Sequence, residues 1–181
     1  MPASGKVRWG WHRLSSPWAK QLVADAGISP GDLVVDIGAG AGAVTAHLVA
    51  AGAQVVAVEF HPRRAALLRE CFADEPVTVV RADSGALRLP RRPFRVVANP
   101  PFVATSAVLR RLLVPGSRLV GADLVLQHAA ARRWADGRAP GANRWARDHA
   151  VVLGRRIPRT AFTPPPAVDC TTLVIRRRPD R

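Results

Sequence analysis

The sequence predicts an α/β fold of the Rossmann-like class, with a mostly parallel sheet and an antiparallel hairpin at one edge. Short valine-rich runs alternate with helical stretches along most of the chain, which is typical of parallel strands buried on both faces. A glycine-rich turn follows the first of these runs, and consecutive strand-like runs end the chain. The length of 181 residues fits one domain.

The first predicted element is a helix that Ser16 caps, that carries Pro17 in its first turn and that Gly27 ends. Four valine-rich strands follow, bounded by turn or helix signals. We expect these strands over 33–37, 54–59, 77–81 and 94–99. Helices are predicted between and after them over 43–51, 62–73 and 105–113, with Thr105 as the cap of the last.

The last third of the chain has a different pattern. A strand over 122–127 is predicted to lead into a helix over 128–135 and a polar loop over 136–144. Three strand-like runs follow, RDHAVVLG (147–154), RRIPRTAF (155–162) and VDCTTLVIRRR (168–178). We expect the last two of these runs to pair as the antiparallel edge hairpin across TPPP (163–166).

The charge balance points to a polyanionic partner. Lys and Arg number 27 against 13 Asp and Glu, a net charge of +14, and such a surface favours nucleic acid. Cys71 and Cys170 lie far apart in no metal-ligand spacing, so we expect no disulfide framework, no metal site and a reducing, cytoplasmic location. The uncharged run 37–58 contains four glycines and changes pattern several times, which excludes a membrane span.

The string DIGAGAGA (36–43) lies where a buried strand turns into a helix, which is typical of a nucleotide-cofactor site. Gly38 and Gly40 let the backbone approach a ligand. Through Ala43 the string also fits the dinucleotide fingerprint, so it does not separate NAD from S-adenosylmethionine. Asp36 favours S-adenosylmethionine, because a carboxylate attracts a sulfonium and repels a pyrophosphate.

Two further acidic residues follow successive strands. Glu59 comes 19 residues after Gly40, at the end of the second strand, where a carboxylate accepts hydrogen bonds from ribose hydroxyls. Asp83 follows the third strand and is predicted to accept from an adenine amino group. Because the carboxyl ends of parallel strands meet at one edge, Asp36, Glu59 and Asp83 should line one ligand crevice.

The string NPPF (99–102) closes the fourth strand. Its two prolines end the strand and lack N–H groups, which leaves carbonyls free to accept. The Asn99 side-chain oxygen and a proline-bonded carbonyl can both accept from one amino group, and Phe102 offers a flat face for a base. We therefore predict that Asn99, Pro100 and Phe102 hold an amino group toward a methyl donor. The alternative is a strand-ending turn with a core phenylalanine.

The order of these motifs, together with AFTPPPAVD (161–169), resembles the rRNA adenine N6-methyltransferases, particularly the Erm-type macrolide-resistance enzymes. The resemblance extends from about residue 9 to residue 178. It implies transfer of methyl from S-adenosylmethionine to N6 of an adenine in the peptidyl transferase loop of 23S rRNA, with macrolide, lincosamide and streptogramin resistance. The related housekeeping group, which dimethylates small-subunit rRNA, is the second candidate.

The resemblance also implies roles for single residues. Asn99 and Phe102 correspond to residues that hold the target adenine. The segment WHRL (11–14) stands where the family usually has Gln-Asn/His-Phe beside the methionine end of the cofactor. The residues expected to contact S-adenosylmethionine are His12, Leu14, Asp36, Gly38, Gly40, Glu59, Phe60, Asp83, Ser84 and Asn99.

We expect a basic, tryptophan-containing segment over 1–15 and a catalytic domain over 16–181. Family members normally continue into a small helical domain after the last strand, which we expect this chain to lack. RNA contacts would then come from the catalytic domain, where arginine and tryptophan interleave. The expected RNA-binding residues are Arg8, Trp9, Arg13, Arg132, Arg133, Trp134, Arg138 and Arg144, with Trp11, Trp145 and the tail 176–178 as further candidates.

Other functions use parts of the same pattern. Methylation of adenine in DNA or of a glutamine amide in protein would also use an Asn-Pro-Pro-aromatic string, although the net charge disfavours a protein substrate. A non-catalytic RNA-binding module and an NAD-binding protein are alternatives of another class. The intact string 99–102 argues against both. We expect a monomer that uses no metal.

Overall fold

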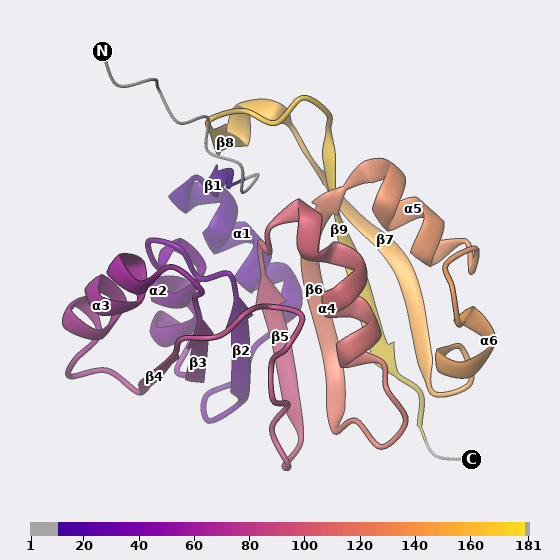
Figure 1. Ribbon diagram of the computed structural model, residues 1–181, viewed down its shortest axis with the longest axis horizontal. Coiled ribbons are helices and arrows are strands. Elements are labelled where there is room, and N and C mark those ends of the chain that lie inside the picture. Colours follow the sequence, from indigo (N-terminus) through magenta and orange to yellow (C-terminus); the bar gives the residue numbers. More distant parts are fainter. Residues whose placement is uncertain (1–10, 180–181) are drawn as a thin grey trace.

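The structure, a computed structural model, describes residues 11–179. Its centre is a sheet of seven strands in the order β4-β3-β2-β5-β6-β9-β7 (Figure 1). The first five strands in this order are parallel, and β9 runs antiparallel to both of its neighbours. The strands are β2 Leu33–Ile37, β3 Gln54–Val58, β4 Val77–Val80, β5 Phe94–Ala98, β6 Leu119–Gln127, β7 His149–Ile157 and β9 Cys170–Arg177.

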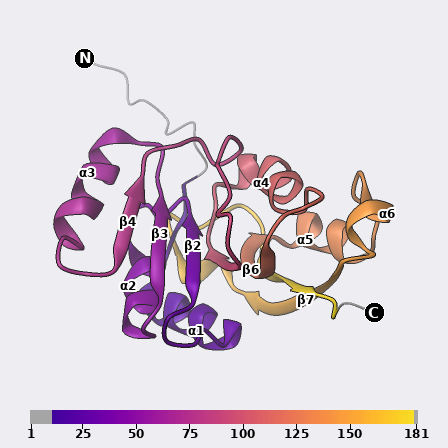
Figure 2. The same ribbon diagram turned by 90° about the horizontal axis from the view of Figure 1, so that it is seen from below.

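Helices cover both faces of this sheet. Figure 2 shows α1 and α2 on one face and α4 and α5 on the other. The helices are α1 Ser16–Ala26, α2 Ala43–Ala50, α3 Pro62–Cys71, α4 Thr105–Leu112, α5 His128–Ala135 and α6 Ala142–Trp145. Within residues 11–179, no helix is long and apolar enough to cross a membrane.

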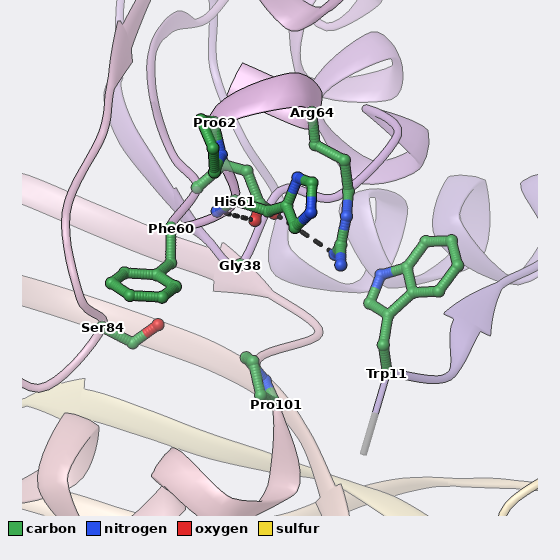
Figure 3. A pocket seen from close by; sticks show the side chains of 9 residues that line it. Trp11, Gly38, Phe60, His61, Pro62, Arg64, Ser84 and Pro101 are labelled. Carbon is green, nitrogen blue, oxygen red and sulfur yellow. Dashed lines mark hydrogen bonds and ion pairs between the residues drawn. The ribbon is translucent and has the colours of Figure 1, made fainter. Parts of the chain in front are cut away.

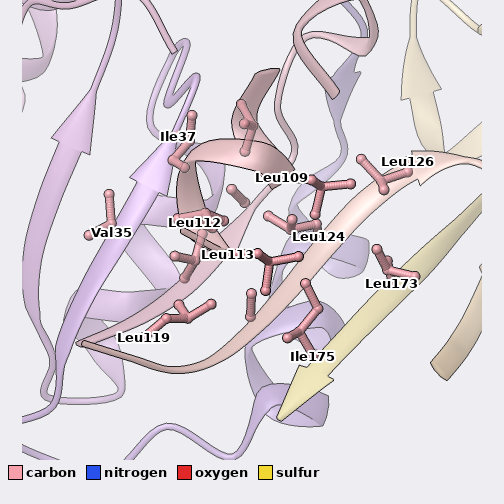
Figure 4. Packing of buried hydrophobic residues seen from close by; sticks show 14 of the residues in the cluster. Val35, Ile37, Leu109, Leu112, Leu113, Leu119, Leu124, Leu126, Leu173 and Ile175 are labelled. Atoms are coloured by element: carbon pink, nitrogen blue, oxygen red, sulfur yellow. The ribbon is translucent and has the colours of Figure 1, made fainter. Parts of the chain in front are cut away.

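Each central strand contributes to two hydrophobic cores, because successive side chains of a strand point to opposite faces. Val35 packs toward α4, with Leu109 and Leu124 in the same cluster (Figure 4). Its neighbour Val34 belongs to the other cluster, beneath α1 and α2. Burial on both faces explains why the sequence of these strands is continuously apolar.

A second, two-stranded sheet lies beside the carboxyl edge of the large sheet. It pairs β1 Arg13–Leu14 with β8 Phe162–Thr163, which brings together segments almost 150 residues apart. Leu14 is buried in the core beneath α1. Two short 3-10 helices, η1 Phe102–Ala104 and η2 Arg159–Ala161, complete the elements.

Both predicted helix caps were wrong. The N-cap of α1 is Ser15, and the hydroxyl of Ser16 forms a hydrogen bond with His47 Nε2 at 3.0 Å. Thr105 has helical backbone angles, φ −46° and ψ −54°, because η1 runs directly into α4, whose N-cap is Ala104. A capping residue needs a non-helical backbone, so Thr105 cannot act as one. The predicted stop at Gly27 is confirmed by its left-handed conformation.

The two strands that pair at the antiparallel edge differ from the predicted ones. The single strand β7 spans 149–157 and therefore joins the first two predicted runs, and it pairs with β9. An irregularity between Leu153 and Arg156 lets β7 continue past Gly154. The segment around TPPP (163–166) instead supplies β8. Two smaller differences are that β6 begins at Leu119 and that α6 lies within the predicted loop 136–144.

Candidate functional site

The predicted crevice lies at the carboxyl ends of β2, β3 and β5 and in the segment after β4. The larger hollow there has a volume of about 170 Å³. Figure 3 shows its lining side chains, with Phe60 and Ser84 on one side and Trp11 and Arg64 on the other. Its lining residues are Trp11, Gly38, Glu59, Phe60, His61, Pro62, Arg64, Ser84 and Pro101.

The glycine-rich turn after β2 brings the neighbouring segments close. Gly38 and Gly40 have φ values of 76° and 58°, a backbone conformation that favours glycine. A Cβ on Gly38 would lie 2.7 Å from Cδ of Pro101, and a Cβ on Gly40 would lie 2.9 Å from Nε1 of Trp11. Glycine is therefore required here for packing as well as for the turn.

Glu59 braces this turn from the end of β3. Its Oε2 accepts a hydrogen bond from the Gly40 N–H at 2.9 Å, and its Oε1 accepts one from the His61 N–H at 2.7 Å. The Arg64 guanidinium lies 3.8 Å from Oε2 and 4.7 Å from the centre of the Trp11 ring. Each carboxylate oxygen keeps a further lone pair for a ligand hydroxyl. The sequence did not predict the contact between Trp11 and Arg64, because no regular spacing relates these two residues.

Asp36 is almost fully buried at the end of β2. Its Oδ2 accepts a hydrogen bond from the Thr45 hydroxyl at 2.7 Å, whereas its Oδ1 is buried without a partner in the described part of the chain. Burial raises the pKa of Asp36 to about 7; hydrogen bonds from Thr45 oppose this shift and the Glu59 charge adds to it. Asp36 lines a second hollow of about 20 Å³, the glycine hollow. Its other lining residues are Trp11, Arg13, Leu14, Gly38, Ala39, Gly40, Ala41, Ala43, Val44 and Asn99.

Asn99 follows β5, and its amide has a defined orientation. Nδ2 donates a hydrogen bond to the backbone carbonyl of His12 at 2.7 Å. A carbonyl can only accept, so the other end of the amide must be the oxygen. This Oδ1 is buried and has no partner within residues 11–179. The site therefore presents two unsatisfied buried oxygens, one on Asp36 and one on Asn99.

Phe102 lies beside Asn99, and its ring stacks on the imidazole of His12. The ring centroids are 5.4 Å apart and the planes differ by 25°. These residues line a third hollow, the Phe102 hollow, which has no open volume. Its lining residues are Trp11, His12, Asn99, Pro100, Pro101 and Phe102. The structure thus brings the His12 ring against Phe102, while its chain neighbours Trp11 and Arg13 line the glycine hollow.

Three other predicted residues lie around the larger hollow. Phe60 and Ser84 line it, and the Phe60 side chain is half exposed. Asp83 is exposed, and its Oδ1 accepts a hydrogen bond from the Gly85 N–H at 2.8 Å, which closes the turn after β4. Asp83 directly precedes Ser84 in the sequence but is not among the residues that line the hollow.

The predicted RNA-binding residues divide into an exposed set and a buried one. Trp134 was predicted as a contact for RNA, and this was wrong, because it is 3% exposed. It packs against Trp145 with ring centroids 5.8 Å apart, and both belong to the core beneath α5 and α6. Ala131 lies one turn earlier on the same buried face of α5. Trp145, a further candidate, is buried for the same reason.

The arginines near these tryptophans are exposed. Asp136 forms ion pairs with Arg132, at 3.6 Å, and with Arg138. The exposed predicted residues in this part of the chain are Arg132, Arg133, Arg138 and Arg144, and Arg13 is exposed at the rim of the glycine hollow. Arg8 and Trp9 lie outside the described residues.

A model of the family described as ribosomal RNA adenine dimethylase matches residues 6–181. The chain belongs to this family. The resemblance inferred from the order of the motifs is thereby confirmed. Among solved structures, the 23S rRNA methyltransferase ErmE has a TM-score of 0.84 and 26% identity, covering 94% of this chain and 70% of that one. The predicted Rossmann-like methyltransferase fold is confirmed.

Curated relatives of this ribosomal RNA adenine dimethylase family member are named for different functions. An rRNA adenine N-6-methyltransferase of Corynebacterium diphtheriae is 38% identical over 80% of this chain and 57% of its own length. The mycinamicin-resistance protein MyrB of Micromonospora griseorubida is 40% identical over 80% of this chain and 47% of its own. A ribosomal RNA small subunit methyltransferase A of a Synechococcus strain is 33% identical over 96% and 68%. The chain spans about half the length of the first two.

Proposed function

We propose that the protein transfers a methyl group from S-adenosylmethionine to N6 of an adenine in 23S rRNA. The observation that carries this proposal is the Asn99 amide, which the His12 carbonyl holds with a buried, unpartnered Oδ1. A buried acceptor without a partner costs free energy, on the order of 1–3 kcal/mol, unless a ligand supplies a donor. The exocyclic amino group of adenine is such a donor.

The residues of the site fit S-adenosylmethionine. This cofactor carries a sulfonium and an ammonium group, and the unpartnered, buried Oδ1 of Asp36 suits either positive group. The glycine hollow, with Asp36, Gly38, Gly40 and Leu14, would hold the methionine end. The larger hollow, with Glu59, Phe60 and Ser84, would hold the adenosine, and Asp83, next to Ser84 in the sequence, would accept from the adenine amino group. When bound, S-adenosylmethionine supplies an electrophilic methyl group.

The residues of the Phe102 hollow would orient the acceptor. Asn99 Oδ1 and the Pro100 carbonyl accept hydrogen bonds from the adenine amino group, which directs the nitrogen lone pair away from them and toward the methyl donor. Phe102 provides a face on which the extruded base stacks. Catalysis then comes from orientation and from hydrogen bonds that fit the reacting amine.

Family membership supports ribosomal RNA as the substrate. The net charge of +14 favours RNA binding. Arg13, Arg132, Arg133, Arg138 and Arg144 are exposed and available for phosphate contacts. An enzyme that modifies ribosomal RNA would act in the cytoplasm. We propose that this one acts as a monomer and uses no metal. The 23S target is supported by the similarity to the 23S rRNA methyltransferase ErmE, and antibiotic resistance by the similarity to the mycinamicin-resistance protein MyrB. The small-subunit relative supports small-subunit rRNA as the second candidate.

The deciding experiment offers 23S and 16S rRNA, each free and in assembled subunits, with radiolabelled S-adenosylmethionine, and maps the product by primer extension. We expect N6-methyladenine in the peptidyl transferase loop of 23S rRNA. Methylation of 16S rRNA alone would replace this proposal with the small-subunit one. Binding of RNA without any transfer would favour a non-catalytic RNA-binding module.

A further inference from the structure

The imidazole of His12 is fixed between two segments that are far away in the sequence. Its ring stacks on Phe102, at a centroid distance of 5.4 Å. On the other side, Nδ1 lies 2.7 Å from the backbone carbonyl oxygen of Pro164. Because a carbonyl accepts and cannot donate, Nδ1 must carry the hydrogen of this bond. This contact therefore fixes the tautomer of the neutral ring.

The backbone around His12 is held as firmly as its side chain. Leu14 pairs with Phe162 in the two-stranded sheet, and the Ser15 N–H donates to the Ala161 carbonyl at 2.9 Å. These bonds fix the position of the chain two residues after His12. The ring of His12 thus has a fixed base, a hydrogen bond to the TPPP turn and a stacking partner.

The ring contact takes one of the two faces of Phe102. A base can then stack only on the opposite face, which defines the side from which it enters. Phe102 is half-buried at the start of η1, and its side chain packs against the core cluster beneath α1 and α2. A ring already held in one orientation loses less conformational entropy when a base binds to it.

We infer that His12 is a positioning residue for the target base: its imidazole, tied to Pro164, holds the plane of the Phe102 ring on which adenine stacks. This inference rests on the proposed function. It moves His12 from the cofactor, where the sequence had suggested it, to the acceptor. The His12 backbone carbonyl holds Asn99 separately, so side-chain substitutions change the ring and leave that bond in place.

Three substitutions separate the two contacts of the ring. His12→Phe keeps a stacking face and loses the hydrogen bond to Pro164. His12→Asn keeps a donor at a similar position and loses the ring, and His12→Ala lacks both. We expect kcat/KM for RNA to fall about three- to tenfold in His12→Ala and His12→Asn, and by less in His12→Phe, because aromatic pairs contribute in that range. The affinity for S-adenosylmethionine should stay within about twofold in all three variants.

The order of the variants decides between a positioning role and a structural one. Full activity of His12→Asn together with loss in His12→Phe would overturn the inference, because the Pro164 contact alone would then matter. Equal losses in all three variants with a lowered thermal unfolding midpoint would also overturn it. If His12→Ala does not fold, the comparison of the Phe and Asn variants still gives the answer.

A double-mutant cycle with Phe102→Ala tests whether His12 acts through Phe102. In that background His12→Ala should cause no further loss of kcat/KM, because the platform is already absent. A loss as large as in the wild-type background would overturn the inference.

A readout without methyl transfer separates this inference from the proposed function. A single-stranded RNA with 2-aminopurine at the target position should be quenched when the base stacks on Phe102. We expect strong quenching by the wild type and His12→Phe and weaker quenching by His12→Asn. Equal quenching by all variants would overturn the role of His12. Absence of transfer to rRNA, with the quenching order retained, would overturn only the proposed reaction.

Discussion

The larger hollow and the Phe102 hollow adjoin each other but are built in different ways. The larger hollow is open, with about 170 Å³, and backbone N–H groups at strand ends hold its acidic residue Glu59. The Phe102 hollow has almost no volume, and it is assembled from segments around residues 12, 99–102 and 164. The first is thus preformed by the sheet edge, whereas the second depends on contacts between distant segments that hold its polar atoms in place.

The two hollows should therefore respond differently to mutation. Changes at the sheet edge should alter cofactor affinity, since those residues are fixed before the ligand arrives. Changes around Phe102 should alter methyl transfer and leave cofactor affinity nearly intact.

The sharpest separation is expected for Asn99→Ala. Loss of the oriented acceptor should lower methyl transfer by about 10²–10³-fold, the range for removal of one preorganised hydrogen-bonding group. Calorimetry should show affinity for S-adenosylmethionine close to that of the wild type. Transfer at the wild-type rate would contradict the proposed role of the Asn99 amide.

Phe102→Ala, a second change in the Phe102 hollow, should also weaken methyl transfer. Stacking of a base on such a platform contributes roughly 1–3 kcal/mol, so kcat/KM for RNA should fall correspondingly. Phe102→Trp is the matched variant and should retain activity, because stacking needs only a flat face. Equal activity of the Ala and Trp variants in a methyl transfer assay would exclude a stacking role.

Gly38→Ala should affect both hollows, because Gly38 lines the larger hollow and lies against Pro101, which lines the Phe102 hollow. Its Cβ would lie 2.7 Å from Pro101 Cδ, and its φ of 76° adds strain of roughly 1–3 kcal/mol. Both cofactor affinity and methyl transfer should decline. Gly116→Ala is the control, since Gly116 has a φ of 79° and open space around it. Denaturant unfolding should show a larger loss for Gly38→Ala; equal losses would mean that the contact with Pro101 is irrelevant.

The cofactor side should depend on pH through Asp36. Its pKa in the folded protein is raised to about 7, so below pH 7 the carboxyl group is protonated and attracts a cation poorly. Affinity for S-adenosylmethionine should fall about tenfold for each pH unit below 7, and binding there should release a proton. Calorimetry in buffers of different ionisation enthalpy measures both quantities.

The same pKa sets the pH dependence of stability without cofactor. Because the folded pKa of Asp36 lies above its usual 3.8, the folded state binds more protons than the unfolded state between these values. The contribution of Asp36 should therefore make the protein less stable as pH rises from about 4 to 7. Asp36→Asn should remove both dependences, whereas Asp74→Asn, at an exposed loop position, should keep them.

The smallest effect is expected outside both hollows. If about five phosphates of unpaired RNA are neutralised, the slope of log affinity on log salt should be near −3.5. Replacing Arg132 and Arg133 together by Gln should flatten it by roughly 1–2 and weaken binding to many RNAs alike. Arg91 and Arg118, which are exposed and precede the amino ends of β5 and β6, are the control pair. Binding that does not change with salt would contradict phosphate contact.

The sequence by itself determined the parallel half of the fold. The strand 33–37 was predicted with its exact bounds, and the other parallel strands in that half to within one residue, because burial on both faces leaves a continuous apolar signal. It also determined that Asp36, Glu59 and Asn99 meet at one edge, since each lies at the carboxyl end of a parallel strand or directly after it. Such inferences need only local periodicity and the rule that parallel strands end together.

Only the tertiary structure decided the contacts between distant segments. The pairing of β7 with β9 and the stacking of His12 on Phe102 carry no periodic signal. A tryptophan beside arginines suits a core and an RNA surface equally well until the buried face of its helix is known. A histidine 152 residues from its hydrogen-bond partner cannot be assigned by spacing. These features depend on which surfaces the folded chain brings together, and no local pattern in the sequence encodes that choice.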